Sequence, residues 1–414
     1  MRNKPTVRCS WSMAFAILLG GCYLSTPVGP EPRDEPIDTP PCPSPPDVRC
    51  VRQEAGGCSR WVFTDAVCDE LTDVWSCPGG SRTYERASPA SDSCRPFLAS
   101  PVPVLRSTGI TLETGSGRCL WLVSGGGPPD GVDVPHLGAY VPDGLPFGAC
   151  PEQGELIGGE APRSIMDASE LGPDALIGIS DSIRHAGQTW IYYRHWVLDP
   201  SEPFFVRKLG TRLAVFDDAS ETIRLLDGFI WTGDEDYGDS ALVIDGVPHL
   251  FGCHGPPDFM AYHCYLTRLA AGPLESGSGY EYFAGDHDWL NDQDAEAAVL
   301  TAGPHRFSAR FHAPSGRYVQ VFIAGFGDRI EIRTAESVTG PWTAPRPLVS
   351  CELPADDIEA FCGYPMLHPE LADPARPDEL VITYDIASLA PDGAERMAND
   401  PVAYWPRLVR TAIP

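Results

Sequence analysis

The sequence lacks a membrane-spanning apolar run and has few positive charges. Its 30 Lys and Arg residues are outnumbered by 57 Asp and Glu residues, which gives a formal net charge of −27. A transmembrane helix needs about 20 consecutive apolar residues, and the N-terminal apolar run covers only residues 11–19. Nucleic-acid binding depends on clustered Lys and Arg, so this acidic chain is not expected to bind nucleic acid.

The sequence also lacks the motifs of several enzyme classes. It has no Gly-rich phosphate loop, no serine nucleophile elbow and no HExxH pair in a supporting strand–helix context. No cysteines have the double CxxC spacing of a zinc site. Nucleotide-dependent and peptidase functions are therefore disfavoured, and we expect neither a metal centre nor a cofactor.

Two clusters of metal-ligand residue types do not change that expectation. His249, His254 and His263 are close in the sequence, but side chains on strands need not converge. The acidic stretch 286–296 offers hard oxygen ligands for Ca²⁺, although it lacks the glycine and the spacing of an EF-hand loop. A solvated loop is favoured there, and Ca²⁺ binding is the alternative.

Residues 1–21 have the layout of a bacterial signal peptide. Arg2, Lys4 and Arg8 precede the apolar run, and the segment contains no acidic residue. Cys22 follows directly after Leu19-Gly20-Gly21, an arrangement that resembles the lipobox of bacterial lipoproteins. We expect cleavage before Cys22 and acylation of its thiol. Ordinary signal cleavage, with Cys22 in a disulfide, is the alternative.

The residue after Cys22 predicts where the lipoprotein is sent. Tyr23 stands where a signal for retention in the inner membrane would usually show Asp. The resemblance therefore implies lipid anchoring at the outer membrane, on its periplasmic face or at the cell surface. Contact with the membrane is expected only through the lipid on Cys22. Loss of the signal peptide changes the net charge from −27 to −30, which favours solubility.

Two segments separate Cys22 from the main body. Residues 22–47 are rich in proline, which fixes φ and cannot donate to a strand ladder, so a semi-rigid tether is predicted. Residues 48–98 are dense in cysteine and predict a small segment that needs disulfides because its core is too small. The pairing of the cysteines in this region stays open: Cys42, Cys50, Cys58, Cys68, Cys77 and Cys94.

The cysteine count indicates an oxidising compartment. The chain has 14 cysteines, and without Cys9 in the signal peptide and the lipidated Cys22 an even twelve remain. Two disulfides are predicted to pin rim loops: Cys351 with Cys362, and Cys119 with Cys150.

Residues 99–414 are predicted to be all-β, because short apolar runs alternate with Gly, Pro, Asp and Ser. The clearest unit consists of a strand at 239–244, a hairpin turn at Asp245-Gly246, a strand at 249–253 and a third strand at 261–269. In this pairing Cys253 and Cys264 face one another on adjacent strands. We therefore predict a cross-strand disulfide between them.

The same order of strands recurs along this region. Units start near residues 107, 181, 239, 307 and 364, a spacing that suits four-stranded blades with loops of variable length. We predict a five-bladed β-propeller behind the Cys-rich segment and the tether. A two-layer sandwich is the alternative, in which the aromatic second strands would simply face the core. The final run, 408–413, is expected to close the ring.

The fourth unit carries a resemblance to known propellers. Its motifs resemble those in the five-bladed propellers of glycosidases such as arabinanases and β-xylosidases: Ser308-Ala309-Arg310-Phe311, Gly316-Arg317-Tyr318, Thr334-Ala335-Glu336-Ser337 and Gly340-Pro341-Trp342. Over residues 101–414 the chain is most similar to secreted bacterial propellers described as glycosyl-hydrolase-like. The resemblance implies a glycan or polysaccharide as the partner, held in the central funnel.

In those glycosidases, carboxylates at the starts of the innermost strands project into the funnel as base, acid and pKa modulator. Glycoside hydrolysis needs two carboxyl groups across the scissile bond. Asp181, Asp239 and Glu370 stand at corresponding strand starts, so the resemblance implies that they are the catalytic residues. For each of them, the alternative is a strand or turn cap that faces water.

Other funnel positions supply candidates for binding the sugar. Arg310, Tyr364 and His368 occupy comparable positions and are predicted to hydrogen-bond sugar hydroxyls. Trp190 offers an aromatic face for stacking on a pyranose ring, although core packing is favoured for it.

The first unit departs from the family's pattern. Related propellers often carry Phe-Gly-Asp-Thr after the Leu-Trp strand, but this chain has Val123-Ser124-Gly125-Gly126-Gly127, so an expected acid is missing. Two functions therefore stay open. The funnel binds a glycan and hydrolyses it with paired carboxylates, or the Cys-rich segment and the propeller rim form a non-catalytic module that binds a cell-envelope protein or polysaccharide. A monomer is expected.

Overall fold

The structure is a computed structural model that describes most residues from 109 onward and short segments before them. The described residues are 49–54, 60–65, 67–69, 74–76, 82–83, 92–96, 109–124, 136–140, 155–157, 164–167, 169–172, 174–201, 206–233, 237–254, 262–303, 307–324, 327–372, 376 and 378–413. The predicted signal peptide, the tether with Cys22, and Cys42, Cys58, Cys77 and Cys150 lie outside them. No helix within these ranges is long and apolar enough to cross a membrane.

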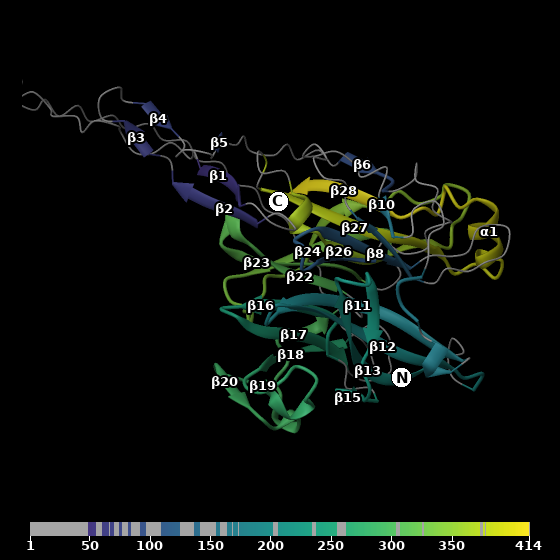
Figure 1. Ribbon diagram of the computed structural model, residues 1–414. Helices are drawn as coiled ribbons and strands as arrows, with labels where there is room; N and C mark the ends of the chain where they lie inside the picture. The colour runs from purple at the N-terminus through teal and green to yellow at the C-terminus, as the bar shows by residue number, and fades with distance from the viewer. Residues whose placement is uncertain are drawn as a thin grey trace, which may run out of the picture.

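Five antiparallel sheets of four or more strands follow one another along the chain (Figure 1). We number them as blades 1 to 5. Blade 1 contains β7 (Ile110–Glu113), β8 (Cys119–Ser124), β9 (His136–Tyr140) and β10 (Glu155–Leu156). Blade 2 contains β11 (Ala175–His185), β12 (Gln188–Leu198), β13 (Val206–Asp217) and β14 (Thr222–Leu225), with β15 (Trp231–Thr232) beside β13. The one α-helix of the described chain is α1 (Gly393–Asn399).

The other three blades repeat this meander. Blade 3 contains β16 (Ser240–Ile244), β17 (Val247–His254), β18 (Tyr262–Leu269), β19 (Tyr280–Gly285) and β20 (Asp288–Leu290), with β21 (Leu300–Gly303) beside β18. Blade 4 contains β22 (Phe307–His312), β23 (Arg317–Ile323), β24 (Arg329–Ala335) and β25 (Arg346–Ser350). Blade 5 contains β26 (Ala360–Leu367), β27 (Glu379–Ser388), β28 (Arg407–Ala412) and β6 (Asp92–Cys94).

The turn between the first two strands of blade 3 shows why the repeat could be predicted. Asp245 and Gly246 have φ angles of 50° and 81°, which is the left-handed pair that a tight two-residue hairpin requires. β16 and β17 pair in register on either side of this turn. Cys253 and Cys264 are register partners on β17 and β18 and form the predicted disulfide.

The core lies between neighbouring sheets and excludes the two-layer sandwich. Four buried apolar clusters each join one sheet to the next. Ile110 and Ile191 belong to the cluster between blades 1 and 2, and Tyr192 and Leu250 to the cluster between blades 2 and 3. Similar clusters join blades 3 and 4 and blades 4 and 5. A chain of sheet-on-sheet interfaces is what a propeller requires, so the propeller prediction is confirmed.

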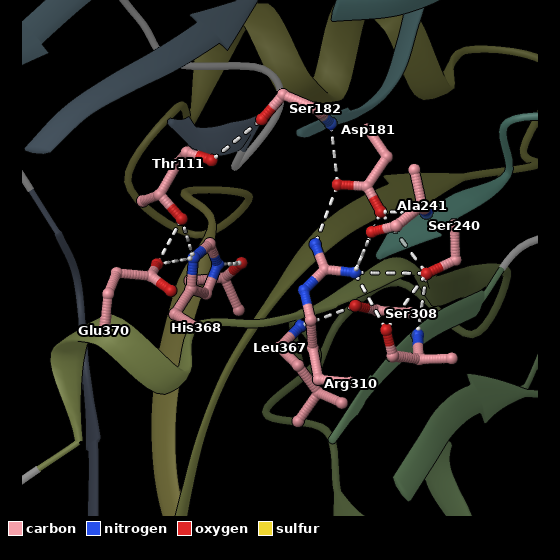
Figure 2. Close-up of polar contacts among 12 residues, drawn as sticks. Thr111, Asp181, Ser182, Ser240, Ala241, Ser308, Arg310, Leu367, His368 and Glu370 are labelled. Atoms are coloured by element: carbon pink, nitrogen blue, oxygen red, sulfur yellow. Dashed lines mark hydrogen bonds and ion pairs between the residues drawn. The ribbon is translucent and has the colours of Figure 1, made fainter. Parts of the chain in front are cut away.

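Hydrogen bonds between the innermost strands form a ring around the axis. Ser182 Oγ of β11 donates to the carbonyl of Thr111 on β7, 3.2 Å away. The Ala241 N–H of β16 donates to Asp181 (2.7 Å), and the Ala309 N–H of β22 donates to Ser240 Oγ (2.9 Å). The ring continues with the Leu367 N–H donating to Ser308 Oγ (3.1 Å) and closes between His368 and Thr111 (Figure 2). All five blades therefore meet at one axis.

The last blade is completed from both ends of the chain. β28 pairs with β27 on one side and with β6 on the other. The indole N–H of Trp405 also donates to the carbonyl of Pro96 at 2.8 Å. The predicted closing run 408–413 therefore packs as a strand of blade 5, and its outer neighbour comes from the predicted Cys-rich segment.

Two other predictions concern cysteines and Trp190. Cys351 and Cys362 form the predicted rim disulfide. Cys119 is disulfide-bonded, and its predicted partner Cys150 lies outside the described residues. Trp190 packs against the cluster between blades 2 and 3, and its indole N–H donates to the carbonyl of His185 at 3.3 Å. Its role is core packing.

Candidate functional site

Asp181 is held in the ring by a break in the strand register. The pairing of β11 with β12 shifts between Ile179 and Asp181, and the Asp181 side chain is fully buried. Its oxygens accept hydrogen bonds from the N–H groups of Ser182 (2.8 Å) and Ala241 (2.7 Å) and from both terminal nitrogens of Arg310, 2.7 and 2.9 Å away. A carboxylate with these partners is a positioning group, because it has no oxygen left to reach a ligand.

Arg310 links this buried carboxylate to the axis. Its side chain is 20% exposed, whereas that of Asp181 is not exposed. Burial acts to lower the pKa of Arg310, but the charge and hydrogen bonds of Asp181, with a further contribution from the charge of Glu370, raise that pKa above its ordinary value. The guanidinium is therefore a fixed cation with a set orientation.

A second polar group lies across the ring from this ion pair (Figure 2). His368 is 1% exposed. Its Nδ1 lies 3.0 Å from Thr111 Oγ1 and 3.2 Å from Glu370 Oε1, and its Nε2 lies 2.7 Å from Thr383 Oγ1. Thr111 Oγ1 also donates to the Glu370 carboxylate. The Trp121 ring contacts the imidazole with 5.0 Å between centroids.

These contacts determine the protonation of Glu370. Burial acts to raise its pKa, but the hydrogen bonds from His368 and Thr111 and the charge of His368 together lower the pKa below the ordinary value. Glu370 is therefore a carboxylate at neutral pH. A general acid for glycoside hydrolysis needs a raised pKa instead, so Glu370 is suited to accepting hydrogen bonds or acting as a base.

A cavity of about 170 Å³ lies at the axis next to these groups. Its polar lining is Thr111, Glu113, Ser182, Arg184, Arg310 and Glu370, and Leu112 and Ile183 complete it. Glu113, Arg184 and Glu370 each follow a ring residue by two positions. The cavity therefore lies on the side of the ring toward which the inner strands run.

Asp239 and Tyr364 do not line this cavity. Asp239 precedes the ring residue Ser240, so it lies on the other side of the ring from Glu370. It pairs with Arg194 and accepts from the Cys253 N–H at 3.1 Å. Tyr364 is 44% exposed, has a φ of 50°, and lies where the pairing of β26 with β27 shifts register. Of the three predicted carboxylates, only Glu370 lines the cavity.

Four polar lining residues were missing from the candidates: Thr111, Glu113, Ser182 and Arg184. Sequence reasoning looked at the starts of the inner strands, but the cavity is lined from their later residues. Glu113 and Arg184 do carry a signal, since each is a charged residue two positions beyond an inner-strand residue that faces the axis. In blade 1, Val123 and Ser124 belong to β8, and the glycines after them lie outside the described residues.

The described residues show no metal cluster. Among them, no group of three or more His, Cys, Asp or Glu side chains is placed to hold an ion. His254 Nε2 lies 2.6 Å from Glu296 Oε1, while His249 Nδ1 lies 2.9 Å from the carbonyl of Val247. Asp292 accepts from the Asp294 N–H at 3.2 Å. Of the histidines and acids singled out in the sequence, His249, His254, Asp292 and Glu296 thus have local partners.

Solved structures resemble the fold at low sequence identity. A protein from Bacteroides ovatus ATCC 8483, described as a "putative hydrolase", matches with a TM-score of 0.54 and 16% identity over 75% of this chain and 86% of its own. A GH43_1 enzyme from Xanthomonas citri complexed with xylose matches with a TM-score of 0.46 and 12% identity over 78% and 90% of the two chains. At these identities the likeness shows the fold alone.

An endo-arabinase from Bacteroides thetaiotaomicron VPI-5482 matches with a TM-score of 0.38 and 14% identity, over 78% of this chain and 98% of its own. No curated protein matches the sequence. A family model matches residues 174–411, which are more than half of the chain. Blades 2 to 5 lie almost entirely within that range. The chain belongs to the family described as "Domain of unknown function (DUF5005)".

Proposed function

We propose that this propeller binds a glycan in the cavity at its axis. The observation that carries the proposal is the lining itself. Two carboxylates, two guanidinium groups and two hydroxyl groups from four blades line one cavity. Sugar hydroxyls both donate and accept, so a mixed set of fixed charged donors and acceptors suits them. Asp181 and His368 support the proposal because they hold Arg310 and Glu370 in place.

The size of the cavity supports a single sugar unit. Its volume of about 170 Å³ lies below the roughly 300–1,000 Å³ typical of sites for drug-sized ligands. A terminal residue of a longer glycan would enter it, while the rest of the chain would lie outside.

Binding without hydrolysis is the reading that the geometry favours. Asp181 has no free oxygen, Asp239 is paired with Arg194 beyond the ring, and Glu370 is ionised. Hydrolysis is the second candidate, and one observation favours it. Glu113 and Glu370 line the same cavity, so they form the one pair of carboxylates there for the acid and base roles.

The place of action is part of the same proposal. A lipid on Cys22 and the Pro-rich segment 22–47 would hold a monomeric propeller away from an outer-membrane surface, where polysaccharides are accessible. Labelling of Cys22 with a radioactive fatty acid, compared with a Cys22→Ser variant, tests the anchor.

The binding test is a glycan array followed by a hydrolysis screen on residues 23–414. The informative variant is Glu370→Gln, which keeps the size of the side chain and removes the charged acceptor. The matched control is Glu336→Gln, because the Glu336 side chain is 84% exposed on blade 4. Asp239→Ala is a poor probe, since it would leave Arg194 as a buried cation without its carboxylate.

Binding that is weakened by Glu370→Gln but not by Glu336→Gln, without turnover, supports a lectin-like funnel. Turnover that Glu370→Gln abolishes supports hydrolysis. If no glycan binds, or if Glu370→Gln leaves glycan binding unchanged, the proposal of a binding funnel is wrong. A non-catalytic module that binds its partner through the propeller rim then explains the protein better.

A further inference from the structure

A second cavity lies in blade 2, away from the axis. It has a volume of about 210 Å³ and is lined by residues of β12, β13 and β14, by the 3₁₀ turn Ser169–Leu171 and by residues 226–227, which follow β14. On β12, Ile191, Tyr193 and His195 alternate onto one face of the sheet. Ile191 and Tyr193 pack toward blade 1. The cavity is therefore on the face of blade 2 that is directed at blade 1, and it shares no residue with the funnel.

His195 lines this cavity and has no hydrogen-bond partner among the residues that the structure describes. It is 5% exposed, and neither of its ring nitrogens has a partner within the described chain. Buried polar groups are nearly always paired, so an orphaned imidazole beside a cavity points to a missing ligand. The Phe229 ring stacks against the imidazole with 5.7 Å between centroids. Burial, and then the charge of Arg212, lower the pKa of His195, so the ring is neutral at neutral pH.

Arg212 lines the same cavity as a buried cation that forms no ion pair with any described residue. It is 9% exposed. Its Nε donates to the carbonyl of Gly228 at 3.1 Å, and its Nη2 donates to the carbonyl of Leu226 at 3.0 Å. Its guanidinium carbon lies 5.2 Å from the centre of the Phe229 ring. None of these partners carries a negative charge, and a buried charge is costly unless it is paired.

A third unpaired group lies beside Arg212. Tyr193 is the register partner of Arg212 on the adjacent strand. Its hydroxyl group is buried and lacks a partner within the described chain. Burial raises the pKa of Tyr193 to about 12, so the hydroxyl keeps its proton and can donate it to an acceptor.

We propose that this cavity binds a small organic monocarboxylate, such as a sugar acid. The carboxylate pairs with Arg212 and accepts from His195, which both line the cavity, and Tyr193 beside Arg212 is a further donor. Leu171, Leu225 and Leu226 form an apolar wall for the carbon skeleton of the ligand. Glu170 and Asp227 also line the cavity. These acids repel any anion, and a phosphate dianion more strongly than a monoanion, so the ligand carboxylate depends on direct pairing with Arg212.

The test is isothermal titration of D-galacturonate into residues 23–414, with glucose, acetate and inorganic phosphate as separate probes. Galacturonate and acetate are expected to bind and glucose is not. The Arg212→Gln variant should bind galacturonate at least about tenfold more weakly, because it lacks the charged hydrogen bond from the guanidinium to the ligand. Arg317→Gln is the matched control, since the Arg317 side chain is 45% exposed on blade 4.

Two milder variants separate binding from folding. His195→Phe keeps the stacking and removes the ring nitrogens, so it should weaken galacturonate binding about tenfold without unfolding the chain. Tyr193→Phe removes a hydroxyl that has no partner among the described residues, so the melting temperature without ligand should stay equal or rise while binding weakens. The proposal is wrong if Arg317→Gln weakens galacturonate binding as much as Arg212→Gln does. It is also wrong if phosphate binds more tightly than the carboxylates, or if no carboxylate binds.

Discussion

At the scale of single residues, the carboxylates of Asp181 and Glu370 near the axis have different roles. Asp181 receives its donors from the chain itself and so holds the inner strands and Arg310 in place. Glu370 keeps part of its side chain exposed in the cavity. Two carboxylates near one axis thus separate into a structural role and a binding role, and each role has its own test.

Replacing Asp181 should cost stability before it affects anything else. Asp181→Asn leaves the Arg310 guanidinium without its buried partner. Breaking such a pair costs about 3–5 kcal/mol, and the lower end applies because Arg310 keeps some solvent contact. Urea unfolding measures this loss. Arg317→Gln, which breaks the exposed pair with Glu336, should cost less than about 1 kcal/mol. Equal losses in the two variants would contradict the role given to Asp181.

The lowered pKa of Glu370 predicts a pH dependence of stability. A carboxyl whose pKa is depressed on folding stabilises the protein above its ordinary pKa of 4.5, and that contribution is lost as the pH falls through the folded-state value. The free energy of unfolding should therefore decrease below about pH 4.5. In Glu370→Gln the decrease should be smaller, as shown by urea midpoints between pH 3 and 7. An identical pH profile would mean that Glu370 has no such contacts.

At the scale of strands and turns, the hairpins were predictable and the lining of the funnel was not. Asp245-Gly246 and the Cys253–Cys264 pair are local, because the turn chemistry sets the register of β16, β17 and β18. In blade 4, the motif Gly340-Pro341-Trp342 lies between β24 and β25, and the fourth strand follows it at Arg346–Ser350. The residue of an inner strand that lines the cavity depends on how far neighbouring blades are shifted along the axis relative to one another. Short sequence patterns do not determine that shift.

The cross-strand disulfide gives a prediction for one element. The Cys253→Ala/Cys264→Ala double variant opens a loop with a sequence separation of 11 residues. The loss expected from the greater freedom of the unfolded chain is about 2–3 kcal/mol. Both sulfurs are buried in the cluster between blades 3 and 4, so a small cavity cost adds to it. Chemical denaturation checks the size, and an unchanged midpoint would show that the pairing of β17 with β18 suffices alone.

At the scale of the whole molecule, the propeller closes through residues that are far apart in the sequence. β6 precedes the boundary predicted at residue 99, yet it pairs with β28 near the C-terminus. The boundary at residue 99 was predicted from the density of cysteines. The pairing of two strands so far apart in the chain cannot be predicted from a single sequence. In Figure 1, β6 lies beside β28. The N-terminal segment therefore contributes a strand to the fold.

Truncation tests whether β6 is needed to complete blade 5. A chain that begins at residue 99 lacks β6 and the Pro96 carbonyl that accepts from Trp405. The outer edge of β28 would then be unpaired, and an exposed edge promotes association between chains. Compared with residues 23–414, the truncated chain should melt several degrees lower and elute as a larger species in size-exclusion chromatography.

Cys94 is disulfide-bonded, so Cys94→Ser in the longer chain serves as the control. If that single change reproduces both effects, the disulfide matters rather than the strand. If the truncated chain is monomeric and equally stable, β6 is not needed to complete blade 5.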